Sequence, residues 1–188
     1  MALKQYLISL KKQIIIFCLL FVFFVFVGFF SAQSSPKEAE LLLEKIMEIV
    51  EPLAEMPAFG QFLFILLNNS LILFLVVVFG LVFGIFPFLV LFSNATLIGL
   101  VAFLAKTAFS WPVFFLATLP HGVIEVPALI LACAAGYNLG QKVFERIFKK
   151  QGNIKSELNL ALIFFLKVIL PFLVLAALIE VFITSKLI

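Results

Sequence analysis

The sequence predicts an all-α membrane protein, a polytopic transmembrane helix bundle that forms one domain over residues 1–188. Of its 188 residues, 65% are hydrophobic and 12% are charged, whereas a soluble domain has roughly 45–50% apolar and about 25% charged residues. The mean hydropathy is +1.29, and residues 56–105 contain no charged side chain. A core of this size cannot hide so much apolar surface, so the excess must face lipid. We expect about five spans, one external amphipathic helix, and one short segment of less certain type.

The first expected span covers residues 14–30 and follows Lys11 and Lys12. At about 1.5 Å per residue it reaches roughly 25 Å, close to the 30 Å of a hydrocarbon core. It is longer than the roughly 7–15 residues of a signal-peptide core, and no clear Ala-x-Ala site follows it. We therefore expect a retained transmembrane helix.

The external amphipathic helix is expected over residues 36–56. Ser35 can serve as its N-cap, Pro36 suits the first helical position, and Glu38 lies in the first turn. The acidic residues that share one face are Glu44, Glu48, Glu51 and Glu55, and the apolar residues opposite are Leu42, Ile46, Ile49, Val50 and Leu53. The helix either packs on the protein or lies along the membrane surface, and its acidic face argues against an anchor on anionic lipid.

The uncharged run is too long for one span, so it must fold back. Residues 84–87, Gly-Ile-Phe-Pro, are the best break, which predicts spans at 62–83 and 88–105. Residues 107–120 contain a turn signal, Ser110-Trp111-Pro112, and an apolar stretch too short to cross. This segment is either interfacial or half of a re-entrant hairpin, and the latter requires protein around its backbone.

The last two spans are expected at 121–140 and 158–183. The fourth should continue as a helix through Lys149 and break at Gly152-Asn153, and Pro171 should kink the fifth. The basic residues cluster before the first span and between Lys142 and Lys155. By the positive-inside rule, this arrangement predicts a multi-pass protein of the cell membrane with a cytoplasmic N-terminus and an external C-terminus.

Polar side chains inside spans are costly, so each needs a partner or a purpose. We expect a polar intramembrane cluster of His121, Glu125, Lys167, Asn68, Asn69, Asn94 and Asn138. His121 and Glu125 share a helix face, and Lys167 lies near the middle of its span. Its most plausible partner is Glu125, with His121 and Glu180 as competitors, and the alternative role is counter-ion to an anionic substrate. Glu180 lies nearer the outer end, where it can reach headgroups.

Small residues continue the His121–Glu125 face along the same helix. They are Ala128, Ala132, Gly136 and Gly140. Small side chains at this spacing let a second helix approach closely, so we expect a packing seam there.

The residue types and motifs of the chain argue against several other functions. One histidine is too few for a typical metal site, and Cys18 and Cys133 lie in apolar runs where they read as small hydrophobic residues. No motif of a hydrolase, a nucleotide-binding loop or a dinucleotide site is present. No basic patch with interleaved aromatics suggests nucleic acid. We therefore expect no catalytic residues, no metal, no cofactor and no nucleic-acid partner.

The stretch Pro120-His121-Gly122-Val123-Ile124-Glu125, with the small-residue segment 134–140 after it, resembles the stage II sporulation protein M family. The earlier Asn- and Gly-bearing helices of that family look similar to those containing Asn68-Asn69, Gly80, Gly84, Asn94 and Gly99. The resemblance implies an integral membrane protein. In sporulating bacteria, the namesake resembles a scaffold that works with cell-wall hydrolases during engulfment.

Three functions follow from these observations. The leading hypothesis is a non-enzymatic scaffold that recruits or organises other membrane or envelope proteins, as a homo-oligomer and most simply a homodimer. The second is a transporter or channel with His121, Glu125 and Lys167 lining a polar cavity. The third is an intramembrane hydrolase that uses His121 and Glu125. A water-accessible path through the bundle, a nucleophile beside His121, or a dry packed pair would separate them.

Overall fold

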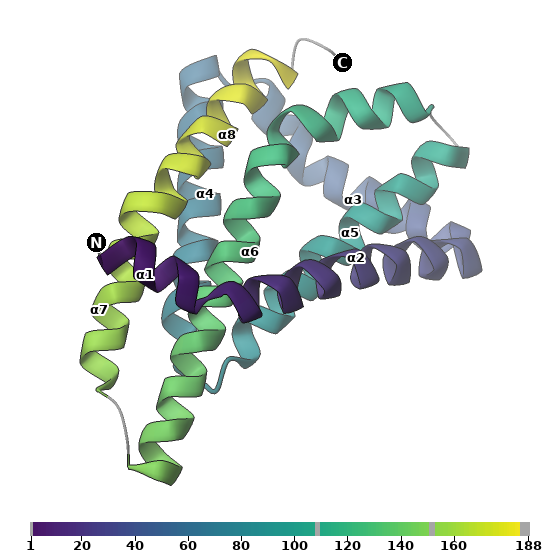
Figure 1. The fold of residues 1–188 in the computed structure, drawn as a ribbon. Helices are drawn as coiled ribbons and strands as arrows, with labels where there is room; N and C mark the ends of the chain where they lie inside the picture. Colours follow the sequence, from purple (N-terminus) through teal and green to yellow (C-terminus); the bar gives the residue numbers. More distant parts are fainter. Residues whose placement is uncertain (1, 108–109, 151–152, 185–188) are drawn as a thin grey trace.

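The computed structural model describes residues 2–107, 110–150 and 153–184. Within these ranges the chain is helical and contains no strand, which confirms the all-α prediction (Figure 1). Five helical stretches of the described chain are long and apolar enough to span a bilayer: Lys11–Ser34, Ala58–Phe79, Ile85–Thr107, Thr118–Lys149 and Ile154–Phe182. The protein is therefore a multi-pass membrane protein.

The N-terminal part contains α1 (Ala2–Ser9), α2 (Lys11–Ser34) and the amphipathic helix α3 (Pro36–Ala54). Pro36 occupies the first turn of α3 as its sequence predicts, because a helix N-terminus leaves backbone N–H groups unused there. The expected cap is wrong in one respect: the Ser35 side chain makes no capping hydrogen bond. Pro52 lies inside the last turn of α3, and Pro57 precedes α4 (Ala58–Phe79).

The break in the uncharged run lies at residues 80–84, slightly before the expected position. Phe83 and Gly84 both have positive φ angles, of 52° and 74°, so the chain reverses through a left-handed turn. The next helix, α5 (Ile85–Thr107), then carries Pro87 in its first turn, where a missing N–H costs nothing.

The segment expected to be interfacial or re-entrant is not a separate element. It forms the start of one long helix, α6 (Trp111–Lys149), which contains Pro120 and Pro127. Residues 108 and 109 lie outside the described residues. The first part of α6 runs at an angle to the rest (Figure 1), as expected where an internal proline removes a helical hydrogen bond.

The C-terminal span is one continuous rod made of three segments: α7 (Ile154–Phe164), a π-helical turn η1 (Phe165–Ile169) and α8 (Leu170–Phe182). Asn153 caps α7 by accepting a hydrogen bond from the Ser156 backbone N–H at 3.3 Å. The expected break at Gly152 lies outside the described residues. Instead of a simple kink at Pro171, the helix widens just before it, because Pro171 cannot donate to the Lys167 carbonyl.

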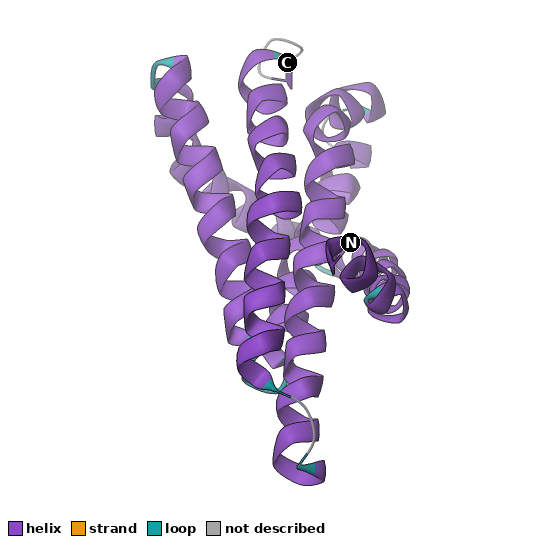
Figure 2. Cartoon of the chain, turned by 60° about the vertical axis from the view of Figure 1, so that its left-hand side comes forward, coloured by secondary structure: helices purple, strands orange, loops and turns teal. Residues whose placement is uncertain are grey.

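The helices form two groups that meet at α6. Helices α4, α6 and α7–η1–α8 stand side by side, whereas α2 lies across them and packs along α5 (Figures 1 and 2). At the α2–α5 crossing the backbones touch: a methyl group on Gly28 would overlap the Thr96 carbonyl, and one on Gly99 would overlap the Val25 carbonyl. Small residues therefore bring these two helices together.

Candidate functional site

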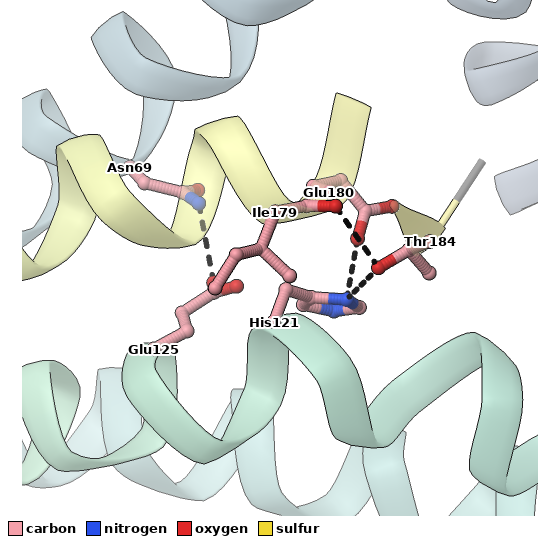
Figure 3. Close-up of polar contacts among 6 residues, drawn as sticks. All are labelled: Asn69, His121, Glu125, Ile179, Glu180 and Thr184. Carbon is pink, nitrogen blue, oxygen red and sulfur yellow. Dashed lines mark hydrogen bonds and ion pairs between the residues drawn. The ribbon is translucent and has the colours of Figure 1, made fainter. Parts of the chain in front are cut away.

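Two polar side chains project from the start of the central part of α6, one turn apart (Figure 3). His121 forms an ion pair through Nδ1 with Glu180 of α8. The same nitrogen lies 3.5 Å from the Thr184 hydroxyl oxygen. The side chains of His121 and Glu180 are 20% and 34% exposed, so the pair is partly shielded and still reachable.

Glu125 faces α4 instead. The Asn69 amide donates a hydrogen bond to Glu125 Oε1 at 3.2 Å, and the Asn68 amide donates to Asn69 Oδ1 at 3.3 Å. Three helices thus contribute to one polar cluster. The cluster consists of two groups, His121 with Glu180 and Thr184, and Glu125 with Asn69 and Asn68. Within each group the polar side chains are one another's partners.

A cavity of about 360 Å³ lies beside this cluster. We call it the His121 cavity. It is lined by Val50 and Leu53 of α3, Gln61, Phe64, Ile65, Asn68 and Asn69 of α4, His121 and Glu125 of α6, and Glu180 and Val181 of α8. Its volume falls in the lower part of the roughly 300–1,000 Å³ range of small-ligand sites.

The cavity does not have the geometry of a catalytic triad. In a triad the acid and the nucleophile contact different nitrogens of the histidine ring. Here Glu180 and Thr184 both contact Nδ1, so they compete for one position. Thr184 is also only 1% exposed, and its hydroxyl donates to the Ile179 carbonyl at 3.4 Å.

The described residues of the cavity do not form a typical metal site either. Among the described residues, no group of three or more His, Cys, Asp or Glu side chains is arranged to hold an ion. The two carboxylates of the cavity each use oxygen atoms on an internal partner.

Comparison with known proteins identifies the family of the chain. The family described as Stage II sporulation protein M matches residues 17–185, which is most of the chain. This chain belongs to the stage II sporulation protein M family. A relative in Methanocaldococcus jannaschii, described as an uncharacterized protein, is 33% identical over 129 residues, covering 65% of this chain and 70% of the relative. No solved structure matches the chain.

The histidine and the glutamate of the His-Gly-x-x-Glu stretch, by which the chain resembles the stage II sporulation protein M family, therefore both line the His121 cavity. Gly122, between its two polar residues, has room for a side chain: the nearest atom to an added methyl group would be Thr118 Cγ2, at 4.0 Å, an ordinary van der Waals contact. Packing does not require a glycine there.

The small residues of α6 lie against α4 and the turn that follows it. Ala128 and Ala132 are fully buried. A methyl group on Gly136 would overlap the Val76 carbonyl, and one on Gly140 would meet the backbone of Gly80 and Gly84. The sequence reasoning missed that Gly80 and Gly84 supply the opposite side of this seam, although both stood out as glycines in an apolar run.

A second polar group lies at the other end of α6. Asn138 is buried there with Gln13 of α2, and the Gln13 amide approaches that of Gln141 to 2.9 Å. Tyr6 of α1 is buried beside them, and burial, with a smaller effect of Glu157, raises the pKa of Tyr6 to about 12. The structure therefore separates Asn138 from the cluster around His121. Asn94 is separate as well: it is exposed on α5 and donates to its own helix at the Val90 carbonyl.

Lys167 is the clearest departure from expectation. In the described structure it forms no ion pair with Glu125, and its side chain lies exposed on η1. Phe164, Phe165 and Ile169 around it are buried, so Lys167 lies on the exposed side of this part of the rod. Glu125 is instead satisfied by Asn69. The expected Glu125–Lys167 pair is wrong: Glu125 is bound by Asn69 of α4, whereas Lys167 is exposed on η1.

Substituting Lys167 should therefore cost little. We expect Lys167→Met to leave the free energy of unfolding unchanged or slightly improved, because no internal carboxylate loses its partner. The double variant with Glu125→Gln should show additive effects within about 0.5 kcal/mol, as for sites without shared partners. Unfolding in mixed detergent micelles measures both. A coupling energy above about 1 kcal/mol would show that the two charges do interact.

Proposed function

We propose that this member of the stage II sporulation protein M family is a non-enzymatic membrane scaffold, which recruits partner proteins at the His121 cavity. One observation carries the proposal: the polar cavity opens at one end of the bundle, and the middle of the bundle is packed and apolar. A surface that recruits partners needs an accessible polar cavity. An open transport path cannot have a packed, apolar middle.

The closed middle argues against the transporter or channel. Glu125 and Asn138 are 13 residues apart on α6, or about 20 Å along its axis. The hydrophobic α6 residues between them that are buried are Ala128, Leu129, Ile130, Ala132, Cys133, Ala134 and Ala135. They pack in one hydrophobic cluster with side chains of α2, α4, α5 and the C-terminal rod. Lys167, the third residue expected to line a polar path, does not line the His121 cavity.

The contacts of His121 argue against the hydrolase. The hydroxyl nearest to the imidazole is buried and competes with Glu180 for the same nitrogen. A general base needs a nucleophile within reach and an accessible reacting position.

The proposal includes an orientation and an oligomeric state. We infer a cytoplasmic N-terminus, with α3 and the His121 cavity on the outer face of the cell membrane, from the basic residues before α2 and after Asn138. We infer a homodimer from Asn94, whose exposed side chain lies within a candidate span, since asparagines at such positions hydrogen-bond across helices.

Orientation has a direct check. Glu48 is exposed on α3, so a cysteine placed there in a variant lacking Cys18 should react with a membrane-impermeant maleimide applied to intact cells. A cysteine in place of Phe148, 65% exposed near the end of α6, should react only after permeabilisation. The opposite pattern would invert the topology.

Recruitment is tested by photo-crosslinking in native membranes. A photo-reactive amino acid at Ile49, which is 72% exposed on α3, should form a discrete adduct with a different membrane or envelope protein. The same group at Phe148 should not yield that adduct. Adducts only to lipid from both positions would contradict a scaffold that recruits through α3.

A further inference from the structure

We propose that the His121 cavity binds a basic side chain, arginine or lysine, of the recruited partner. This side chain belongs to a segment with several basic residues, which is attracted to the acidic face of α3. This inference rests on the proposed function and names the chemistry of the partner. It follows from the charge of the cavity, from its shape, and from the helix that borders it.

The charges of the cavity favour a cation. Two carboxylates, Glu125 and Glu180, face it, and the described residues that line it include neither lysine nor arginine. His121 is the one lining group that can carry positive charge, and it is already paired with Glu180. His121 can therefore pair with only one of the two carboxyl groups, so acidic groups outnumber basic groups in the lining.

The uncharged lining groups suit a guanidinium or an ammonium. Glu125 accepts a hydrogen bond from the Asn69 amide through Oε1, which leaves Oε2 available as an acceptor. The Asn68 side chain adds an amide oxygen atom on the same wall, and Phe64 adds an aromatic ring to the lining. A planar guanidinium can combine a carboxylate hydrogen bond with stacking on an aromatic ring.

The size of the cavity favours an organic cation over a bare ion. A volume of about 360 Å³ is far larger than an ion needs, and no three carboxylate, imidazole or thiolate groups converge within the described chain. Long aliphatic stems also fit the remaining lining, which is apolar at Val50, Leu53 and Ile65.

The bordering helix α3 favours a protein over an amine-bearing lipid. Between Pro36 and its C-cap Glu55, α3 carries six glutamates and two lysines, and Glu44, Glu48, Glu51 and Glu55 are all exposed. Val50 and Leu53, on the opposite, apolar face of the same helix, line the cavity, so the acidic face borders the cavity from outside. A partner with several basic residues gains from this acidic face, whereas the phosphate of an amine headgroup is repelled by it.

Binding of a defined peptide to the purified full-length protein in detergent micelles tests the proposal. The probe is a fluorescent hexa-arginine peptide, and its control is hexa-citrulline, in which neutral ureido groups replace the guanidinium groups. We expect the arginine peptide to bind at least about tenfold more tightly, with affinity that falls as salt increases.

Variants assign the binding to the cavity and to α3. Glu125→Gln should weaken the arginine peptide about tenfold, a loss expected for one charge-assisted contact. The triple variant Glu44→Gln, Glu48→Gln, Glu51→Gln, whose positions are all exposed and do not threaten folding, should weaken it about threefold and reduce its salt dependence. Glu145→Gln, a half-buried carboxylate paired with Lys142 near the other end of α6, should leave binding unchanged.

Four results would overturn the proposal: equal binding of the citrulline peptide, unchanged binding by folded Glu125→Gln, unchanged binding by the triple variant, or an equal loss in Glu145→Gln. Displacement of the peptide by glycerophosphoethanolamine at similar concentration would assign the cavity to a lipid headgroup and also overturn it. A partner adduct from Ile49 without arginine-peptide binding would leave the scaffold standing and reject the basic side chain. Peptide binding without any protein adduct would reject the scaffold instead.

Discussion

Gly136→Leu should prevent assembly of the bundle. Even a methyl group at this position overlaps the Val76 carbonyl of α4 and approaches the ring of Pro87. Both obstacles are parts of the backbone or a rigid ring, so neither can turn aside as a flexible side chain would. We expect a loss of at least about 3 kcal/mol in the free energy of unfolding, at the upper end of overpacking costs.

Folding yield and thermal aggregation in detergent measure this loss. The matched control is Gly60→Leu near the start of α4, where an added methyl group has Met56 Cβ at 3.6 Å as its nearest neighbour. That variant should stay within about 1 kcal/mol of the parent, since only ordinary contacts are involved. If Gly136→Leu melts like the control, α6 and α4 do not touch at this point.

Removing one member of the His121–Glu180 pair should lower the free energy of unfolding by more than the partial exposure of the pair suggests. His121→Leu leaves the Glu180 carboxylate without its charged partner, at a cost of about 2–3 kcal/mol for an unsatisfied charged group. The double variant His121→Leu, Glu180→Leu should recover about 1–2 kcal/mol of this loss, because no stranded charge remains.

The pair Lys142–Glu145 provides the comparison. It has an N–O distance of 2.9 Å and lies near the surface, with side chains 34% and 36% exposed. Lys142→Met should cost less than about 0.5 kcal/mol, as is usual for exposed helical pairs. Strictly additive effects of the His121 and Glu180 substitutions would show that the pair contributes nothing to the fold.

The spans could be predicted because their signals are local. A bilayer demands long apolar helices, and each such run is visible without knowledge of its neighbours. The start of α3 at Pro36 and the reversal near Gly84 also depend on local backbone chemistry. The length of α6 was harder, because a helix can continue through Pro120 when its neighbours support the bent backbone.

The partners of polar residues could not be predicted in the same way. His121 and Glu125 are one turn apart, yet one faces Glu180 of α8 and the other faces Asn69 of α4. Which neighbour each meets depends on the rotation and tilt of three helices. Lys167 shows the same limit: the π-turn before Pro171 changes the rotation of the rod, and the lysine lies exposed on it.

Cys133 can test whether the polar cavity ends in a closed, apolar bundle. Cys133 lies on α6 between Glu125 and Asn138, is fully buried, and directs its thiol to the Pro87 carbonyl at 3.3 Å. In native membranes of a Cys18→Ser variant, a charged methanethiosulfonate reagent applied from either side should leave Cys133 unmodified. The reagent is applied for as long as a cysteine introduced at Ile49 needs to react completely. Modification of Cys133 on that timescale would reveal a water-filled path through the bundle and contradict the scaffold.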